Sequence, residues 1–169
     1  MGDPAPAEPL PAGALRDEIQ SRALKLLTTR EHSRLELARK LRQRGYPAAE
    51  VETVLDALVT NDLLSEERLM AAYVAERLGK GFGPVRIRFE LREKGLSDEQ
   101  IQPYLDQEEA SLVESLRLAY RKRFGDEPIS DRRELAKRSR FLEYRGFPSH
   151  LIARFLTSIQ SPPSMQSPQ

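Results

Sequence analysis

Three stretches of the sequence repeat one pattern: LARKLRQRGYPAAEVETVL at residues 37–55, IRFELREKGLSDEQIQPYL at 87–105 and RSRFLEYRGFPSHLIARFL at 138–156. Each has a leucine four residues before a central glycine, a basic residue directly before that glycine and a large apolar residue directly after it. The glycines, Gly45, Gly95 and Gly146, lie 50 and 51 residues apart. Agreement at so many positions within one chain indicates an internal repeat.

Each stretch has the features of two helices joined by a short turn. Glycine directly after a helix can adopt the left-handed conformation that ends it. Pro47, Ser97 and Pro148 follow the turn and are typical of helix starts. Beyond them, apolar pairs such as Val51 and Leu55 are four residues apart and therefore share one helix face. With an amphipathic helix leading into each pair, the unit is three helices in about 50 residues.

The repeat predicts an all-α fold, with three tandem three-helix repeats forming an elongated, curved array in which most contacts join neighbours. The predicted repeats span residues 14–63, 64–107 and 108–159. The flanking segments 1–13 and 160–169 are rich in proline, joined in the second by serine and glutamine. Such composition buries too little apolar surface to offset the entropy of ordering, so we expect two disordered tails.

Two places in the middle repeat conflict with this pattern. Residues 85–91, VRIRFEL, alternate apolar and polar side chains, which is typical of a strand. The repeat predicts a helix there, with Ile87 and Leu91 on one face and Val85 and Phe89 on the opposite one, packed on both sides or open to a partner. Pro103 lies inside the next predicted helix, where it removes a hydrogen bond and should kink or delay the helix.

Composition excludes several classes of protein. The chain has no cysteine, which rules out disulfides and thiolate chemistry. No apolar run approaches the roughly 20 residues of a membrane span, and the N-terminus lacks the features of a secretory signal. With 39% hydrophobic and 31% charged residues, we expect a soluble cytoplasmic protein with a limited core.

The net charge of +1 hides an uneven distribution. Counted from the sequence, residues 1–13 carry −2, residues 14–60 carry +2, residues 61–109 carry −4 and residues 110–169 carry +5. Such a layout suits contact with an anionic surface at one place and a protein at another. Charges scattered over exposed helix faces would give the same count.

No catalytic constellation is recognisable. Residues 79–83, GKGFG, lack the preceding strand of a dinucleotide loop and the GK[ST] of a phosphate loop, so a flexible linker between helices is the better interpretation. His32 and His150 lie in different repeats without ligand-like spacing, and Glu66 and Glu67 suit a helix start. We therefore expect neither an enzyme nor a cofactor or metal site.

Basic residues on the second helix of every repeat are the strongest candidates for a binding surface. Stacked in register, they would form a positive stripe able to contact phosphates or an acidic protein groove. Ordinary solvated helix charge is the competing interpretation, because Glu90 and Glu93 interleave with them. The candidate residues are Arg39, Arg42, Arg44, Arg86, Arg88, Arg92, Lys94, Lys137, Arg138, Arg140 and Arg145.

Motifs over about residues 20–157 resemble the bacterial RecX family of regulatory proteins. The matches are Arg30-x-x-Ser33-x-x-Glu36-Leu37, then Gly83-Pro84-x-x-Ile87-x-x-Glu90-Leu91-x-x-Lys94-Gly95, then Arg145-Gly146-Phe147. The sequence departs from the family pattern at residues 66–71, EERLMA, where a DERFA-like stretch is usual. It departs again at Tyr144, where a second arginine is common.

The resemblance implies a noncatalytic regulator that binds the RecA nucleoprotein filament in its helical groove. Such a protein mainly inhibits RecA strand exchange, ATP hydrolysis and SOS-repressor cleavage, and it binds single- and double-stranded DNA weakly. We further expect a monomer without membrane contact. Two other interpretations stay open: a helical-repeat protein that binds bare DNA independently of RecA, with steep salt dependence, or an unrelated helical scaffold.

Overall fold

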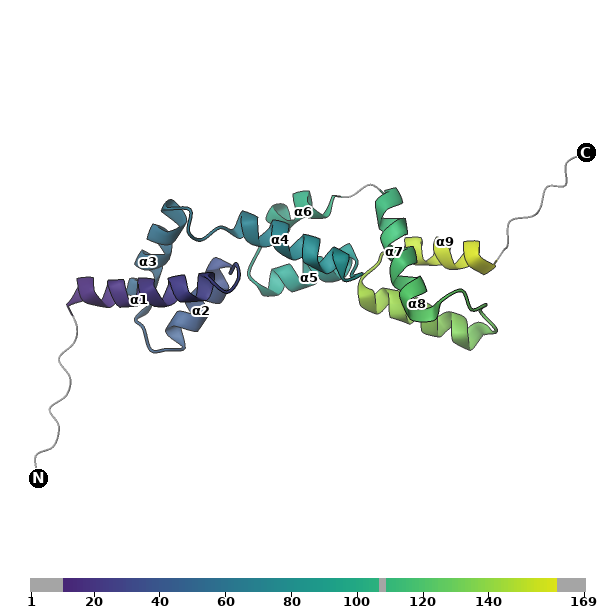
Figure 1. Cartoon of the computed structure of the whole chain (residues 1–169), viewed down its shortest axis with the longest axis horizontal. Helices are drawn as coiled ribbons and strands as arrows, with labels where there is room; N and C mark the ends of the chain where they lie inside the picture. Colours follow the sequence, from purple (N-terminus) through teal and green to yellow (C-terminus); the bar gives the residue numbers. More distant parts are fainter. Residues whose placement is uncertain (1–10, 107–108, 161–169) are drawn as a thin grey trace, which may run out of the picture. The chain divides into compact units, whose positions relative to one another are not determined.

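The computed structural model describes residues 11–106 and 109–160. Within these residues the chain forms nine α-helices and no strand, which confirms the predicted all-α fold of three three-helix repeats. The helices are labelled in Figure 1. Their bounds are α1 Ala12–Leu27, α2 Arg34–Arg42, α3 Ala48–Thr60, α4 Glu66–Gly79, α5 Pro84–Glu93, α6 Asp98–Leu105, α7 Glu109–Phe124, α8 Arg132–Arg145 and α9 Ser149–Gln160.

The turn between the second and third helices has the same backbone geometry in every repeat. Gly45, Gly95 and Gly146 have φ angles of 90°, 90° and 89°. These values lie in the left-handed region that residues with a Cβ atom avoid. The glycines that define the sequence repeat are therefore needed for its conformation.

The chain divides into two compact units, one ending at Leu69 and the other beginning at Met70. In the first unit α1, α2 and α3 pack on one another. A capping box formed by Ser33 and Glu36 starts α2, as the sequence predicts. The core of this unit contains the fully buried side chains Ile19, Leu37, Leu41, Val51, Leu55 and Leu58.

In the second unit α5 packs on α6, and α7 lies beside α8 and α9 (Figure 1). Ile87, Leu91 and Ile101 are fully buried. The α7–α9 core is partly aromatic, with the Tyr120 and Phe155 ring centroids 5.1 Å apart in an edge-to-face contact. Its other buried members include Leu116, Leu142, Leu151 and Ile152.

Residues 85–91 are helical, so the repeat and not the local alternation gives the correct secondary structure. On α5, Ile87 and Leu91 are both 0% exposed, whereas Val85 is 56% and Phe89 62% exposed. The two pairs therefore lie on different faces, as predicted for a helix. The face of α5 that carries Val85 and Phe89 is therefore exposed and not packed against another helix of the described chain.

Pro103 lies inside α6. The helix continues only to Leu105, two residues further. Lacking an N–H, Pro103 forgoes the hydrogen bond back to residue 99. The proline ring is exposed, so no buried side chain has to make room for it.

Of the two predicted tails, the structure describes only the residues next to α1 and α9. Helix α1 begins at Ala12 and α9 extends to Gln160, so each reaches into a segment expected to be disordered. Residues 1–10 and 161–169, which belong to the two predicted tails, lie outside the described residues. So do residues 107 and 108, at the predicted boundary between repeats two and three.

Candidate partner-binding surface

Within the second unit, the start of α5 meets the end of α8. The N–H of Gly83 donates to the Arg145 carbonyl at 2.8 Å, and the N–H of Val85 donates to the Gly146 carbonyl at 3.0 Å. Helix starts leave N–H groups without partners and helix ends leave carbonyls without partners. The two ends therefore satisfy each other, and their helix dipoles attract.

Glycine makes this contact possible on both sides. A Cβ atom built on Gly83 would lie 2.3 Å from the Gly146 carbonyl oxygen. One built on Gly146 would lie 2.3 Å from the Cβ of Arg86. Both distances are far below van der Waals contact, so only glycine lets the two backbones approach this closely.

Arg86 stabilises the same contact between α5 and α8. Its guanidinium donates to the Tyr144 carbonyl at 3.1 Å and to Glu90 at 2.9 Å. It also stacks over the Tyr144 ring, 4.6 Å from the centroid, and over Phe82 at 5.0 Å. Two hydrogen bonds and two cation–π contacts together fix this side chain in place.

Glu90 is the centre of an ionic cluster behind the junction. It accepts hydrogen bonds from Tyr73 at 2.9 Å, from Arg77 at 2.7 Å and from Arg86. Partial burial favours a raised pKa for Glu90, but the donated hydrogen bonds outweigh it and lower the pKa. Burial, together with the bond to Glu90, raises the pKa of Tyr73 to about 12. The cluster therefore holds a carboxylate and a neutral phenol at neutral pH.

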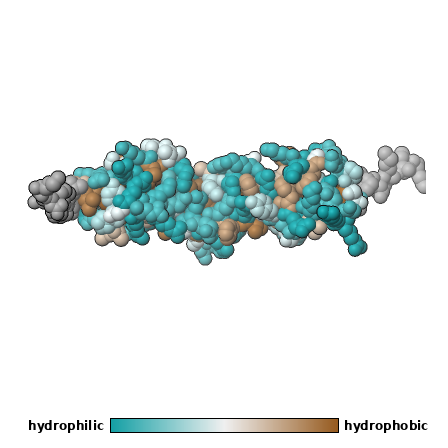
Figure 2. All heavy atoms as spheres, turned by 90° about the horizontal axis from the view of Figure 1, so that it is seen from below, coloured by the Kyte–Doolittle hydropathy of each residue, from teal (hydrophilic) through white to brown (hydrophobic). Residues whose placement is uncertain are grey.

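Exposed apolar side chains lie directly beside this junction. Val85 is 56%, Phe89 62% and Tyr144 70% exposed. Together with Arg86, Glu90, Glu143 and Gly146 they line an open hollow of about 430 Å³. Figure 2 shows one face of the molecule covered mainly by hydrophilic residues, with a few hydrophobic patches. Exposed aromatic residues around a hollow are typical of protein interfaces; we call Val85, Phe89 and Tyr144 the apolar triad.

The repeat alignment shows that Phe89 is an exception. The equivalent positions in the other two repeats are Arg39 and Arg140, and both are exposed. A phenylalanine thus stands on a face where the fold otherwise carries arginine. Packing within the unit does not require it, because Phe89 is more than half exposed.

Most of the predicted basic residues in the second unit are bound to neighbouring groups. Arg88 and Arg92 both donate to Asp98, at 3.3 Å and 2.8 Å. Lys137 pairs with Glu134 at 3.3 Å. The ammonium of Lys94 lies 5.1 Å from the centroid of the Tyr73 ring. These ion pairs reduce the positive field that a continuous basic stripe would need.

In the first unit, the predicted basic residues of α2 and of the turn after it are only partly neutralised. Arg42 pairs with Glu52 of α3. Arg39 and Arg44 are exposed, and no carboxylate among the described residues pairs with either of them. The same holds for Arg140 on α8.

Arg138 is a correction to the predicted surface, because its side chain is only 2% exposed. It donates to Glu134 at 2.9 Å, to the Glu127 carbonyl at 2.8 Å and to the Tyr120 hydroxyl. The repeat alignment contains the signal: Arg138 is equivalent to the buried residues Leu37 and Ile87. Arg138 therefore supports the fold and does not contribute to a surface.

Arg145 has a mixed role. Its guanidinium donates to the Lys80 carbonyl at 3.0 Å and lies 4.7 Å from the Phe82 ring centroid and 5.2 Å from that of Phe141. The side chain is half-buried and held between segments of two repeats. It is thus both a structural contact and a cation at the surface.

Sequence reasoning missed Tyr144 as a surface residue, although its departure from the family pattern was a signal.

In the described parts of the chain, no helix has both the length and the apolar character needed to cross a membrane. Those parts also contain no cluster of three or more His, Cys, Asp or Glu residues able to hold a metal ion.

Comparison with known proteins gives matches along most of the chain. Family models described as the first, second and third three-helix domains of RecX match residues 21–58, 65–105 and 109–156. The Regulatory protein RecX of Pseudomonas syringae pv. tomato is 42% identical over 139 residues, which cover 82% of this chain and 90% of that protein. The Regulatory protein RecX of Pseudomonas putida is also 42% identical over 139 residues, covering 82% and 89%.

Two solved structures share the fold. A crystal structure of regulatory protein RecX has a TM-score of 0.74 at 24% identity, covering 87% of this chain and 74% of that one. The crystal structure of RecX from Lactobacillus salivarius has a TM-score of 0.73 at 22% identity, covering 87% and 97%. Because three consecutive domain models match and close relatives cover most of its length, the chain belongs to the RecX family of regulatory proteins.

Proposed function

We propose that this chain is a noncatalytic regulator that binds the RecA nucleoprotein filament and mainly inhibits RecA recombinase, ATPase and coprotease activity. The observation that carries the proposal is its membership of the RecX family, with relatives named regulatory proteins matching over 139 residues. The chain would act as a monomer in the cytoplasm and bind single- and double-stranded DNA weakly. Its domains would be the three repeats at residues 14–63, 64–107 and 108–159.

The apolar triad is the surface we assign to the contact with RecA protein. Exposed aromatic side chains supply large contact area at low entropic cost, and such residues carry much of the binding energy in protein interfaces. Phe89 and Tyr144 are held by the α5–α8 junction, so binding need not order the backbone beneath them. Arg86 beside them adds a fixed cation.

The test is the DNA-stimulated ATPase of RecA, measured against increasing concentrations of this chain. We expect wild-type protein to lower the rate at stoichiometric ratio. Phe89→Ser and Tyr144→Ser should each raise the half-inhibitory concentration about tenfold, which corresponds to ~1.4 kcal/mol. Val59→Ser removes another exposed apolar side chain, in α3, and serves as the matched control.

Two results would contradict these assignments. An unchanged RecA ATPase at stoichiometric wild-type protein contradicts the function itself. Equal losses in Val59→Ser and Phe89→Ser contradict the assigned surface and leave the function standing.

Exposed Arg39, Arg44 and Arg140 favour a second candidate, a protein that binds DNA independently of RecA. That candidate requires tight binding to bare DNA with a steep salt slope. The ion pairs of Arg42, Arg88 and Arg92 argue against it, because carboxylates compete with phosphates for the same guanidinium groups. Weak binding to bare DNA that strengthens on RecA-coated DNA would count against this candidate.

A further inference from the structure

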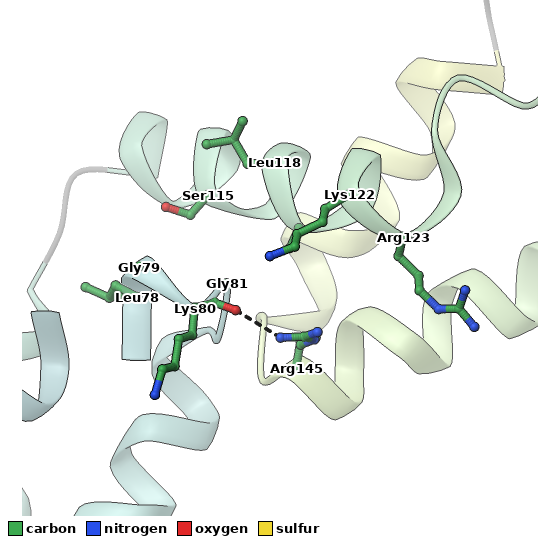
Figure 3. Close-up of a pocket in the computed structure, with 10 residues that line it drawn as sticks. Leu78, Gly79, Lys80, Gly81, Ser115, Leu118, Lys122, Arg123 and Arg145 are labelled. Carbon is green, nitrogen blue, oxygen red and sulfur yellow. Dashed lines mark hydrogen bonds between the residues drawn. The ribbon is translucent and has the colours of Figure 1, made fainter. Parts of the chain in front are cut away.

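A second hollow in the second unit, of about 350 Å³, shares no lining residue with the hollow beside the apolar triad. One wall is the end of α4 and the loop after it, residues 78–81; the opposite wall is α7 between Ser115 and Arg123. Arg145, at the end of α8, closes the hollow from below in Figure 3. We call this hollow the α4–α7 pocket.

The loop wall is fixed by its own hydrogen bonds and by packing. Gly81, two residues after the end of α4, has a φ of 77°, and the N–H of Phe82 donates to the Arg77 carbonyl at 3.0 Å. This is the hydrogen bond of a Schellman ending. A Cβ built on Gly81 would lie 3.3 Å from the Cβ of Ala119, so the loop lies tightly against α7. The pocket is therefore formed without any ligand.

Positive charge gathers in this pocket. Figure 3 shows the amine of Lys122 and the guanidinium of Arg145 directed toward the space between the loop and α7, with Lys80 and Arg123 pointing outward at its sides. None of the described residues that line the pocket is acidic. Lys80 pairs with Glu76, outside the lining. No carboxylate in the described part of the chain pairs with Lys122 or Arg145.

Arg145 is held in place before any partner arrives. One of its terminal nitrogens donates to the Lys80 carbonyl at 3.0 Å, and the rings of Phe82 and Phe141 flank the guanidinium. That bond uses one of five N–H donors. A side chain already fixed loses little entropy on binding, and its remaining donors match the geometry of an oxyanion.

We propose that the α4–α7 pocket binds a phosphate group of a DNA backbone. Arg145 would supply the planar fork, and Lys122 would supply a mobile point charge on the other side. A contact to a backbone phosphate carries no sequence information, so this contact would be independent of sequence. The proposal deepens the proposed function and rests on it, because a regulator of a protein–DNA filament meets both components.

The experiment measures binding of the full chain alone, without RecA, to a fluorescently labelled single-stranded 30-mer of mixed sequence. Fluorescence anisotropy is recorded between about 50 and 200 mM KCl. The variants are Lys122→Gln, the double variant Lys122→Gln/Arg123→Gln and the conservative variant Lys122→Arg. Arg133→Gln removes an exposed cation from the start of α8 and is the matched control. Thermal melts confirm that each variant is folded.

We expect Lys122→Gln to weaken binding about three- to tenfold and to reduce the salt slope by about 0.7, the loss of one phosphate contact on a single strand. Lys122→Arg should restore affinity, and Arg133→Gln should behave as wild type. An oligonucleotide with uncharged methylphosphonate linkages should lose the dependence on Lys122.

Several outcomes overturn the proposal: no measurable wild-type binding at 50 mM KCl, wild-type affinity and slope in the double variant, or equal losses in Arg133→Gln. Binding of a polyglutamate peptide that depends on Lys122 more strongly than DNA binding does would assign the pocket to an acidic protein segment instead. Because RecA is absent, these results are independent of the ATPase test. If a Lys122 variant inhibits RecA normally and binds DNA with wild-type affinity, the proposed function stands and the assignment of the pocket to DNA is wrong.

Discussion

At the scale of single residues, His32 shows how hydrogen bonding determines a protonation state. The ring is 1% exposed, in the turn between α1 and α2. Its Nε2 lies 2.8 Å from the Nζ of Lys40, and its Nδ1 lies 3.0 Å from the Arg30 carbonyl oxygen. A lysine ammonium can only donate, so Nε2 accepts, and Nδ1–H donates to the carbonyl. The arrangement requires a neutral imidazole.

This geometry predicts a pH-dependent stability. Burial lowers the pKa of His32 below its ordinary value, and the charges of Arg30 and Lys40 act in the same direction. The unfolded chain, with a histidine pKa of about 6.5, then takes up the proton more readily than the folded chain. The free energy of unfolding should therefore be highest above pH 6.5 and fall as the pH drops below it.

Urea unfolding at about pH 7.5 and 5.5 measures the effect, in a range above the titration of most carboxylates. His32→Gln should be less stable than wild type at pH 7.5, because it loses the buried hydrogen bonds, but should lose much less stability between the two pH values. An equal decline in both proteins would show that other groups cause the pH dependence.

At the scale of elements, α8 carries arginines with three different functions. Arg138 is buried and makes polar contacts inside the repeat, Arg140 is exposed, and Arg145 joins the repeat to the α4 loop. Charge alone cannot separate these functions, because all three residues are equally basic. Their positions in the repeat separate two of them, since Arg138 aligns with buried Leu37 and Arg140 with exposed Arg39.

We predict that Arg138→Met lowers the free energy of unfolding by about 1–3 kcal/mol, because the Tyr120 hydroxyl and the Glu127 carbonyl would lose a buried donor. Arg140→Met should change it by no more than about 0.5 kcal/mol. Chemical denaturation measures both. At a temperature where it is folded, Arg138→Met should still inhibit the RecA ATPase. If a folded Arg138→Met protein fails to inhibit RecA, Arg138 contributes to binding after all.

Helix α5 shows what sequence reasoning could and could not predict. Comparison between repeats correctly predicted that residues 85–91 are helical, although their apolar and polar side chains alternate as in a strand. The comparison succeeds because the apolar residues at fixed distances before each repeated glycine are the ones that pack in the core. It also predicted the buried pair Ile87 and Leu91. The α4–α7 pocket could not be predicted, because it brings Lys122 and Arg145 together through the end of α4, and no local pattern encodes that contact.

At the scale of the whole molecule, each compact unit has its own core. The core of the first unit includes Leu41 of α2, and that of the second includes Leu142 of α8. The two leucines occupy the same repeat position and are both 0% exposed. They allow one substitution to be compared in two separate cores.

We predict that Leu41→Ala and Leu142→Ala each cost about 2–5 kcal/mol, and that each cost falls on its own unit. The physical reason is that a cavity weakens the contacts of the side chains that line it, and the two buried clusters share no residue. Hydrogen–deuterium exchange with mass spectrometry measures this directly. Leu41→Ala should reduce the protection of α1–α3 and leave that of α7–α9 near its wild-type value, and Leu142→Ala should do the reverse. If either variant lowers protection equally in both sets of helices, the chain unfolds as one cooperative body and the cores are energetically coupled.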